Sequence, residues 1–374
     1  MTAASKAKPP APLLHGDPLR VGRELVGYGR NILLQKGATF GLQHRFFVND
    51  PWELMAEAIA RAVTVRKTRD IAQSFRRQAE DYFRAATTGH EIAVRPVLLY
   101  YAFLNLSKAY GVARGNASLA GRAYHGLTCK PRPEAIPKSL ITFTGKGTLV
   151  FQELLKLLDG NVSVLSSALR LGHLLPQILP GHRLWGYATD RAERFLTVEK
   201  FEVLHLTASK QVWLNLYLSR DDMERLKISE EKAISYADLT EFEVAGTGLD
   251  LVCFQQHRPD TYSTDPAEAL GQIIRRNRNR IWEAVKTASP YRKPYVYCCP
   301  PAERGTRLPQ LLSIYLLMFF LGWVTRYSPG DFDDLLDSKY GPLFDTFISE
   351  SPMQFLYLMA SEILQREVSK PGII

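Results

Sequence analysis

The chain has 374 residues, of which 46% are hydrophobic and 23% are charged. This length and composition exclude an intrinsically disordered protein and allow two or three globular domains with a substantial core. The formal net charge is +9 and the pI is about 9.3. Such an excess of lysine and arginine suits an acidic partner such as nucleic acid, although it also serves solubility alone.

The cysteines and the N-terminus bear on cofactors and location. The cysteines form no Cys-x-x-Cys pair and have no nearby histidine at zinc spacing, so no metal and no other cofactor is expected. They are Cys129, Cys253, Cys298 and Cys299. Residues 1–18 lack the apolar run of a signal peptide, and we expect a disordered tail there. These features favour a protein of the reducing cytoplasm.

Helices are predicted from residue 50 onward. Asp50-Pro-Trp-Glu53 combines a capping aspartate with a proline at the first helical position. Residues 95–110 should form the helix at the centre of the core, because almost every residue from Val97 to Leu106 is apolar. We expect Gly111 to end this helix.

Polar side chains collect at the end of this helix and in the loop that follows. Lys108 and Arg114 are candidate phosphate contacts. Arg122 and His125 are the candidate catalytic pair, because an arginine can hold a phosphate while a histidine exchanges a proton near neutral pH. In the competing interpretation, His125 is a structural cap that hydrogen-bonds to the backbone.

Three segments carry a resemblance to a known family. They are Arg76-Arg-Gln-Ala-Glu-Asp-Tyr-Phe83, Arg95-Pro-Val-Leu-Leu-Tyr-Tyr-Ala-Phe-Leu-Asn-Leu-Ser-Lys-Ala109 and Tyr124-His-Gly-Leu127. Their order resembles the YaaC-like family of bacterial proteins. A pair of helices between Leu311 and Val368 extends the resemblance to residues 40–370.

More distantly, a helix that ends in a loop, a helix rich in tyrosine and alanine, and a following His-Gly-Leu resemble the HEPN helical domains. That resemblance implies an RNA-binding protein or a metal-independent ribonuclease of conflict and stress systems, although many HEPN-like proteins are non-catalytic. Two departures argue against catalysis. Arg84 and His90 fit the loose spacing of HEPN nucleases but straddle a loop, and Arg122-x-x-His125 is shorter than that spacing.

The middle of the chain is predicted to be rich in β-strands. Residues 211–218 alternate between two faces and should pair with residues 201–206 as an antiparallel hairpin. Further strands are expected at residues 249–255 and 295–299.

Residues 275–282, Arg-Arg-Asn-Arg-Asn-Arg-Ile-Trp, are the strongest electrostatic feature. On a helix, Arg276 and Arg280 would stack at four-residue spacing, with Arg275 and Arg278 three apart. These guanidinium groups repel one another unless anions neutralise them. Nucleic-acid phosphate is one explanation, because it matches the planar fork of arginine. Carboxylates elsewhere in the fold are the other.

Two apolar helices are predicted in the last part of the chain. Residues 308–324 are almost wholly apolar, but the run is too short to span a bilayer, so we expect a buried core helix and no membrane. Ser351-Pro-Met-Gln354 should begin a final helix that packs against it.

The predicted fold is α+β, mainly α with a β-rich middle, and with a HEPN-like helical core formed by N-terminal and C-terminal helices. The expected regions are the tail at residues 1–18, an N-terminal helical region at 19–130, a β-containing region at 131–260 and a C-terminal helical region at 261–374.

The predicted function is association with nucleic acid, RNA more than DNA, in prokaryotic antiviral defence or stress response. If the protein is an enzyme, the resemblance implies a metal-independent ribonuclease. The alternative is a non-enzymatic helical scaffold that binds another copy of the chain or a partner subunit.

Overall fold

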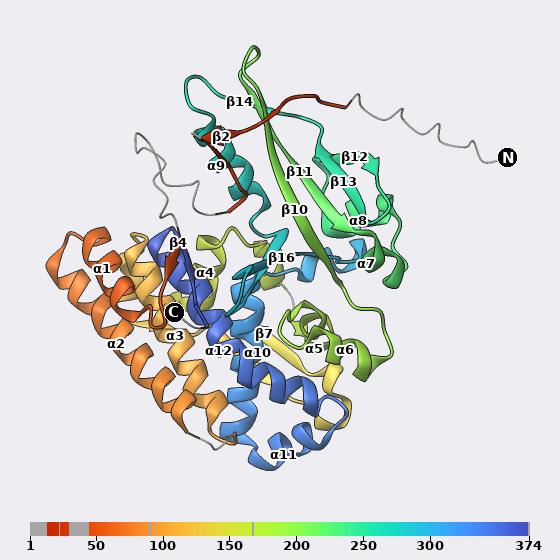
Figure 1. Cartoon of the computed structure of the whole chain (residues 1–374). Coiled ribbons are helices and arrows are strands. Elements are labelled where there is room, and N and C mark those ends of the chain that lie inside the picture. The colour runs from red at the N-terminus through yellow and green to blue at the C-terminus, as the bar shows by residue number, and fades with distance from the viewer. Residues whose placement is uncertain (1–12, 22, 30–44, 90–91, 167, 373–374) are drawn as a thin grey trace. The chain divides into compact units, whose positions relative to one another are not determined.

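The computed structural model describes residues 13–21, 23–29, 45–89, 92–166 and 168–372 (Figure 1). Long helices and mainly antiparallel sheets are its main elements. The structure is about 51% helical and 21% strand, which confirms the predicted mixed α+β class.

The chain folds into two units, each assembled from separate stretches of sequence. Unit 1 contains Leu196–Ile281, Pro294–Cys298 and the described residues of Met1–Leu42. Unit 2 contains Gln43–Phe195, Trp282–Lys293 and Cys299–Ile374. The regions expected from the sequence, divided after residues 18, 130 and 260, are each one continuous stretch. The two units instead each combine segments that lie far apart in the sequence.

Unit 2 is mainly helical. Its α-helices are α1 (Trp52–Ala62), α2 (Arg66–Thr88), α3 (Arg95–Ala113), α4 (Val150–Leu157), α5 (Leu171–Leu174), α6 (His182–Thr189), α10 (Gln310–Tyr327), α11 (Pro329–Asp337) and α12 (Gly341–Leu364). Its 3-10 helices are η2 (Ala117–Ala120), η3 (Pro133–Lys138), η4 (Val162–Ser166), η5 (Leu175–Gln177) and η6 (Pro301–Thr306). Its strands are β4 (Arg45–Phe47), β5 (Ala123–Tyr124), β6 (Leu127–Lys130), β7 (Leu140–Phe143), β8 (Thr148–Leu149), β9 (Leu169–Arg170), β17 (Glu367–Ser369) and most of β15 (Ile281–Val285).

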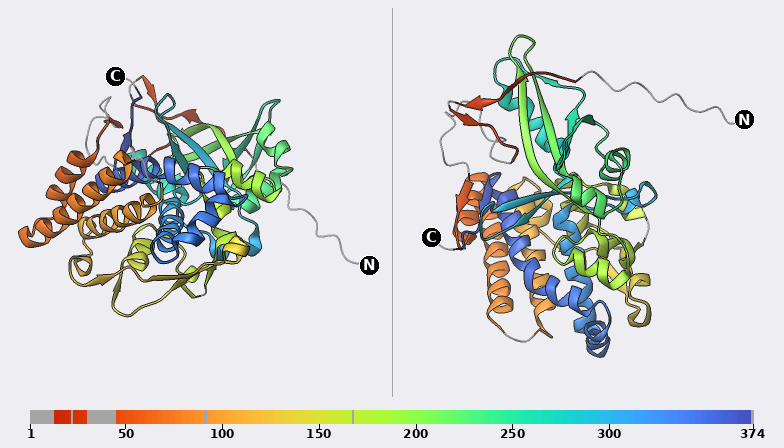
Figure 2. Two further views of the ribbon diagram at one scale, coloured as in Figure 1. Left: turned by 90° about the horizontal axis from the view of Figure 1, so that it is seen from below. Right: turned by 45° about the vertical axis from the view of Figure 1, so that its right-hand side comes forward.

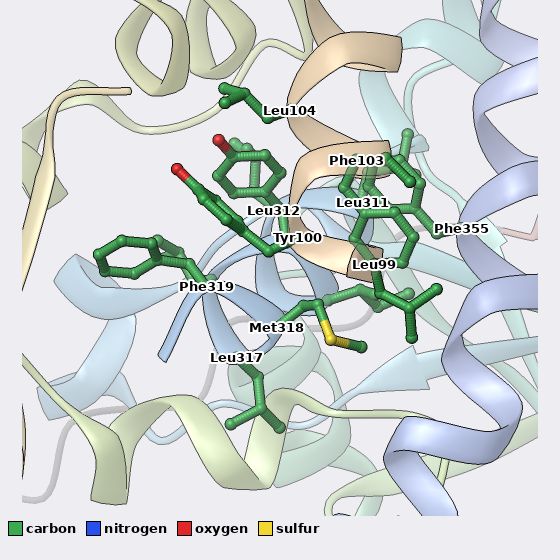
Figure 3. Packing of buried hydrophobic residues seen from close by; sticks show 14 of the residues in the cluster. Leu99, Tyr100, Phe103, Leu104, Leu311, Leu312, Leu317, Met318, Phe319 and Phe355 are labelled. Atoms are coloured by element: carbon green, nitrogen blue, oxygen red, sulfur yellow. The ribbon is translucent and has the colours of Figure 1, made fainter. Parts of the chain in front are cut away.

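The core of unit 2 joins helices from both ends of the chain. Helices α3, α10 and α12 are each buried on most of their circumference and share one apolar cluster. In Figure 2 the orange N-terminal helices and the blue C-terminal helices lie side by side. Phe103 of α3 stacks on Phe355 of α12 with ring centroids 3.8 Å apart (Figure 3). Burial of apolar surface on several helices at once is the main stabilising term of such a core.

Helix α10 is the one described helix that is long and apolar enough to cross a membrane. However, 78% of it is buried within the structure. It is therefore a core helix, as its sequence predicts. A Cβ at Gly322 would lie 3.0 Å from the Pro96 carbonyl oxygen, so this glycine lets α10 approach α3 closely.

Two helix boundaries differ from those predicted. Helix α3 continues through Gly111 to Ala113, and a Cβ at Gly111 would collide with the Leu119 side chain, so this glycine makes room for packing and does not end the helix. Helix α12 begins at Gly341, and Pro352 lies inside it. Pro352 removes one helical hydrogen bond, but buried side chains such as Phe347 and Phe355 hold both halves of α12 in the core.

Unit 1 is built around an antiparallel sheet. Its strands are β1 (Asp17–Pro18), β2 (Arg20–Val21), β3 (Glu24–Leu25), β10 (Phe195–Leu206), β11 (Gln211–Ser219), β12 (Phe242–Thr247), β13 (Leu251–Gln256), β14 (Asp260–Thr261) and most of β16 (Arg292–Tyr297). Its helices are α7 (Arg220–Arg225), α8 (Glu230–Ala237) and α9 (Pro266–Asn277).

The hairpin predicted at the centre of this sheet is confirmed. Strands β10 and β11 pair antiparallel, with Leu206 opposite Gln211 and Val203 opposite Leu214. The next strands follow in the order β11, β13, β12. Helix α9 packs on this sheet through apolar residues such as Leu270 and Ile273.

Most of the expected tail, residues 1–12, lies outside the described residues. The end of that segment packs on the sheet. Asp17 pairs with His205 of β10, and the Leu14 backbone exchanges hydrogen bonds of 2.7 and 3.0 Å with the Gln255 side chain. A buried amide on a strand can therefore order a segment whose own composition favours disorder.

The Phe103–Phe355 contact leads to a stability prediction. Phe355→Ala should lower the free energy of unfolding by about 3–5 kcal/mol, because it opens a cavity between α3 and α12. Urea denaturation followed by circular dichroism measures this change. Tyr187→Ala is the matched control, since Tyr187 is 87% exposed, and it should change stability by no more than about 0.5 kcal/mol. Equal effects of the two substitutions would contradict the shared core.

Candidate nucleic-acid interface

The arginine-rich segment of unit 1 is only partly helical. Helix α9 ends at Asn277, whose side-chain amide donates to the Ile273 carbonyl at 2.9 Å. Residues from Ile281 onward form β15, so the predicted helix over residues 275–282 is wrong after Asn277. The reason is tertiary: Ile281 and Trp282 are buried as strand residues, which propensity and spacing alone do not reveal.

Arg276 is held by two carboxylates of unit 1. Its guanidinium donates to Asp260 at 3.0 and 2.6 Å and to Glu241 at 3.2 Å. The hydrogen bond that Arg276 donates to Asp260 is the main reason that the pKa of Arg276 is raised. A bidentate pair of this kind is geometrically specific.

Arg280 is held in the same way. It lies 3.4 Å from Glu241 and 3.5 Å from Asp238. Arg275 is exposed and Arg278 is half-buried. Carboxylates thus neutralise Arg276 and Arg280, which is the second of the two explanations that the sequence leaves open.

The loop after α3 places the proposed catalytic pair in unit 2. Arg114 is exposed at the end of α3. Arg122 is also exposed, and its guanidinium carbon lies 5.3 Å from the centre of the Tyr124 ring. Strand β5, which contains Tyr124, pairs with β8. Gly126 follows with φ +78° and packs against Leu149, so a glycine is required after the histidine.

His125 is tied to the backbone of its own loop. The Leu127 N–H donates to His125 Nδ1 at 3.1 Å. In the neutral ring the proton therefore lies on Nε2. Burial lowers the pKa of His125, and the positive charges of Arg326 and Lys108 lower it further. His125 is thus mostly neutral near pH 7, and its unprotonated nitrogen is already used.

Unit 2 also carries an aromatic and basic surface, where the sequence did not predict a site. We call it the aromatic–cation surface, and it consists of Tyr82, Tyr101, Trp323, Arg326 and Tyr327. It comes from α2, α3 and α10. Arg326 and Tyr327 are exposed, and the other three residues are half-buried.

The contacts within the aromatic–cation surface form a continuous row. Tyr82 stacks on Tyr101 with ring centroids 5.5 Å apart. Arg326 donates to the Tyr101 hydroxyl at 2.6 Å, and its guanidinium carbon lies 4.4 Å from the centre of the Tyr327 ring. Trp323 adjoins Tyr327 at 4.6 Å between centroids.

Buried aromatic rings connect this row to His125. Phe319 of α10 lies 5.9 Å from Trp323 and 6.0 Å from the His125 ring, measured between centroids. Lys108 is half-buried, and its ammonium lies 5.1 Å from the centre of the Phe75 ring. Burial lowers the pKa of Lys108. The structure therefore brings both Lys108 and Arg326 within electrostatic range of His125.

Part of this surface could have been predicted from the spacing Trp323-x-x-Arg326-Tyr327 in the sequence. Residues three and four apart share one face of a helix, so an arginine flanked by aromatic residues at the exposed end of an apolar helix indicates a surface patch. Tyr82 and Tyr101 join it only through the packing of α2 and of α10 on α3.

A protein-family model described as YaaC-like Protein matches residues 41–363. The chain belongs to the YaaC-like family. This match covers the helices of unit 2, His125 and the aromatic–cation surface. No curated protein and no solved structure matches the chain. Within the described residues, no group of three or more His, Cys, Asp or Glu side chains is placed to hold a metal ion.

The lowered pKa of His125 leads to a prediction about pH. The unfolded chain, in which histidine has a pKa of about 6.5, binds more protons than the folded chain below about pH 7, so this group makes the fold less stable as the pH falls. His125→Asn should keep an acceptor for the Leu127 N–H and remove this dependence. Urea denaturation between about pH 7 and pH 5 should then give a shallower stability profile for the variant. Parallel profiles would show that the pKa of His125 is unchanged by folding.

Proposed function

We propose that this YaaC-like protein binds single-stranded nucleic acid, RNA more readily than DNA, through the aromatic–cation surface of unit 2. The observation that carries the proposal is the position of Arg326 between the rings of Tyr101 and Tyr327. Proteins that bind single strands combine basic side chains for the phosphates with aromatic rings for the bases. Single-stranded regions are also where proteins most often read RNA.

The charge state of Arg326 supports this role. Its hydrogen-bond acceptor is a neutral tyrosine hydroxyl, and no carboxylate of the described residues pairs with it. The positive charge of this guanidinium is therefore not offset by a paired carboxylate. Lys108 and Arg122 add positive charge on the His125 side.

The preference for RNA and the cellular role rest on a HEPN-like core. The long helices α2 and α3 pack together, α10 packs on α3, and the loop after α3 carries His125. This arrangement supports the proposal of HEPN-like ancestry. We accordingly propose a cytoplasmic protein of prokaryotic antiviral defence or stress response.

Binding without cleavage fits His125 better than catalysis does. A general base needs an unprotonated nitrogen that faces the substrate, but Nδ1 of His125 already accepts the Leu127 N–H. A general acid needs the imidazolium form, which the lowered pKa makes scarce near pH 7. We propose that His125 shapes the loop and that Arg122 binds phosphate.

Substitution of the aromatic–cation surface tests the proposal. Tyr327→Ala should weaken binding of a labelled single-stranded RNA by about 1–3 kcal/mol, the usual contribution of one stacked base. Arg326→Ala should weaken binding and reduce the slope of log affinity against log salt by about 1. Fluorescence anisotropy over a salt series measures both effects.

Two exposed residues outside this surface provide matched controls. Arg66 of α2 has a side chain that is 88% exposed, and Tyr187 of α6 is 87% exposed. Arg66 lies sixteen residues before Tyr82 on the same helix, which is about 24 Å along its axis. Arg66→Ala and Tyr187→Ala should leave the affinity unchanged. Equal losses in the control variants would overturn the assignment of the surface.

A non-enzymatic scaffold or protein-interaction subunit is the second candidate. The pairing of Arg276 and Arg280 with carboxylates favours it, because the most basic segment of the chain then needs no polyanion. The exposed ring of Tyr327 suits a second copy of the chain or a partner subunit as well.

Arg276→Ala combined with Arg280→Ala separates the two candidates. The double variant leaves Asp238, Glu241 and Asp260 without these cations, so the free energy of unfolding should fall by about 1–3 kcal/mol. RNA affinity should change far less than in Arg326→Ala. A salt-indifferent protein in which no variant alters RNA binding would favour the scaffold.

A further inference from the structure

Unit 2 contains a cavity of about 240 Å³ that is separate from the residues of the aromatic–cation surface. Leu175 and Trp185 contribute apolar lining, while Arg191, Lys339 and Tyr340 contribute polar lining. This volume lies below the range of roughly 300–1,000 Å³ for drug-sized ligands, so the cavity suits a ligand of about one ring.

The polar groups around this cavity are mainly hydrogen-bond donors. The Arg191 guanidinium and the Lys339 ammonium are exposed, and neither forms an ion pair with a carboxylate of the described residues. Lys339 instead lies 5.4 Å from the centre of the Tyr340 ring. Tyr340 is 5% exposed and lines the cavity beside them. Two cations that form no ion pair favour a ligand that carries negative charge.

Arg194, unlike Arg191 and Lys339, forms a direct ion pair with a carboxylate. It also packs on Trp185, at 5.4 Å from the ring centre, but it donates to Glu303 at 2.6 and 3.2 Å. Glu303 thus pairs directly with Arg194, whereas Arg191 acts on this carboxylate only at longer range and Lys339 forms no ion pair with the described residues.

The backbone holds Arg191 at the cavity. Helix α6 ends at Thr189, Asp190 adopts a left-handed conformation with φ 53°, and the Arg191 N–H donates to the Gly186 carbonyl at 3.2 Å. This closed turn fixes the direction in which the chain leaves α6. Lys339 and Tyr340 come from the segment between α11 and α12, where the Tyr340 N–H donates to the Ser338 hydroxyl at 3.1 Å.

We propose that this cavity binds a small organic anion, with its carboxylate or phosphate at Arg191, Lys339 and Tyr340 and its ring-sized apolar part against Leu175 and Trp185. Planar apolar groups pack well on tryptophan, and oxyanions accept hydrogen bonds from arginine, lysine and tyrosine. A free phosphate would use only the donors and leave the apolar lining uncovered.

Isothermal titration calorimetry on the full chain tests the proposal with phenyl phosphate, benzoate, inorganic phosphate and benzyl alcohol. Phenyl phosphate and benzoate should each bind saturably at one site. Inorganic phosphate should bind at least about tenfold more weakly than phenyl phosphate, and benzyl alcohol should show no saturable binding. Binding that is equally tight for benzyl alcohol, or for inorganic phosphate, would overturn the proposal, as would the absence of saturable binding by both organic anions.

Variants assign the binding to this cavity. Arg191→Ala combined with Lys339→Ala should weaken the binding of phenyl phosphate by about tenfold or more. Both side chains are exposed, so the fold should be retained, and circular dichroism checks this. Arg183→Ala is the matched control, because Arg183 is a 78% exposed arginine of α6 outside the cavity lining. Unchanged affinity in the double variant would overturn the assignment.

Discussion

Helices α3 and α10 are apolar on nearly their whole circumference, and each is stable in water only if other helices cover it. Gly322 allows the two backbones to meet, and the Phe103–Phe355 stack adds α12 to the same core. Because these helices are far apart in the sequence, the core of unit 2 can close only after α12 has been made. The long-range contact is therefore a condition for the rest of unit 2.

The same packing creates the aromatic–cation surface. Tyr101 lies one residue beyond the buried Tyr100 on α3, and Arg326 lies near the end of α10. Neither element alone places a cation between two aromatic rings. Once α3 and α10 are in contact, Tyr101, Trp323 and Arg326 lie together at the partly exposed edge of the helix–helix interface. The proposed binding surface thus lies at the margin of a contact that stabilises the core.

Much of the secondary structure could be predicted from the sequence, because it depends on local patterns. The alternation of residues 211–218 predicted a strand, and the apolar run at residues 97–106 predicted a buried helix. The predictions from local patterns were wrong where the same residue type can serve different structural roles. Gly111 was predicted to end a helix, but it makes room for the Leu119 side chain. Ile281 was placed on a helix, but it lies buried in strand β15.

Electrostatic partners were harder to predict, because a sequence shows where charges are and not which of them meet. Arg276 and Arg280 are conspicuous as neighbours in the chain, yet Asp238, Glu241 and Asp260 neutralise them from other elements of unit 1. Arg326 stands alone in the sequence, and its hydrogen-bond acceptor is a phenol, which does not offset its positive charge. The density of arginines along a chain is therefore a poor guide to binding. What decides the local charge is whether the fold supplies a carboxylate to a guanidinium: it supplies carboxylates to Arg276 and Arg280, and none of the described residues supplies one to Arg326.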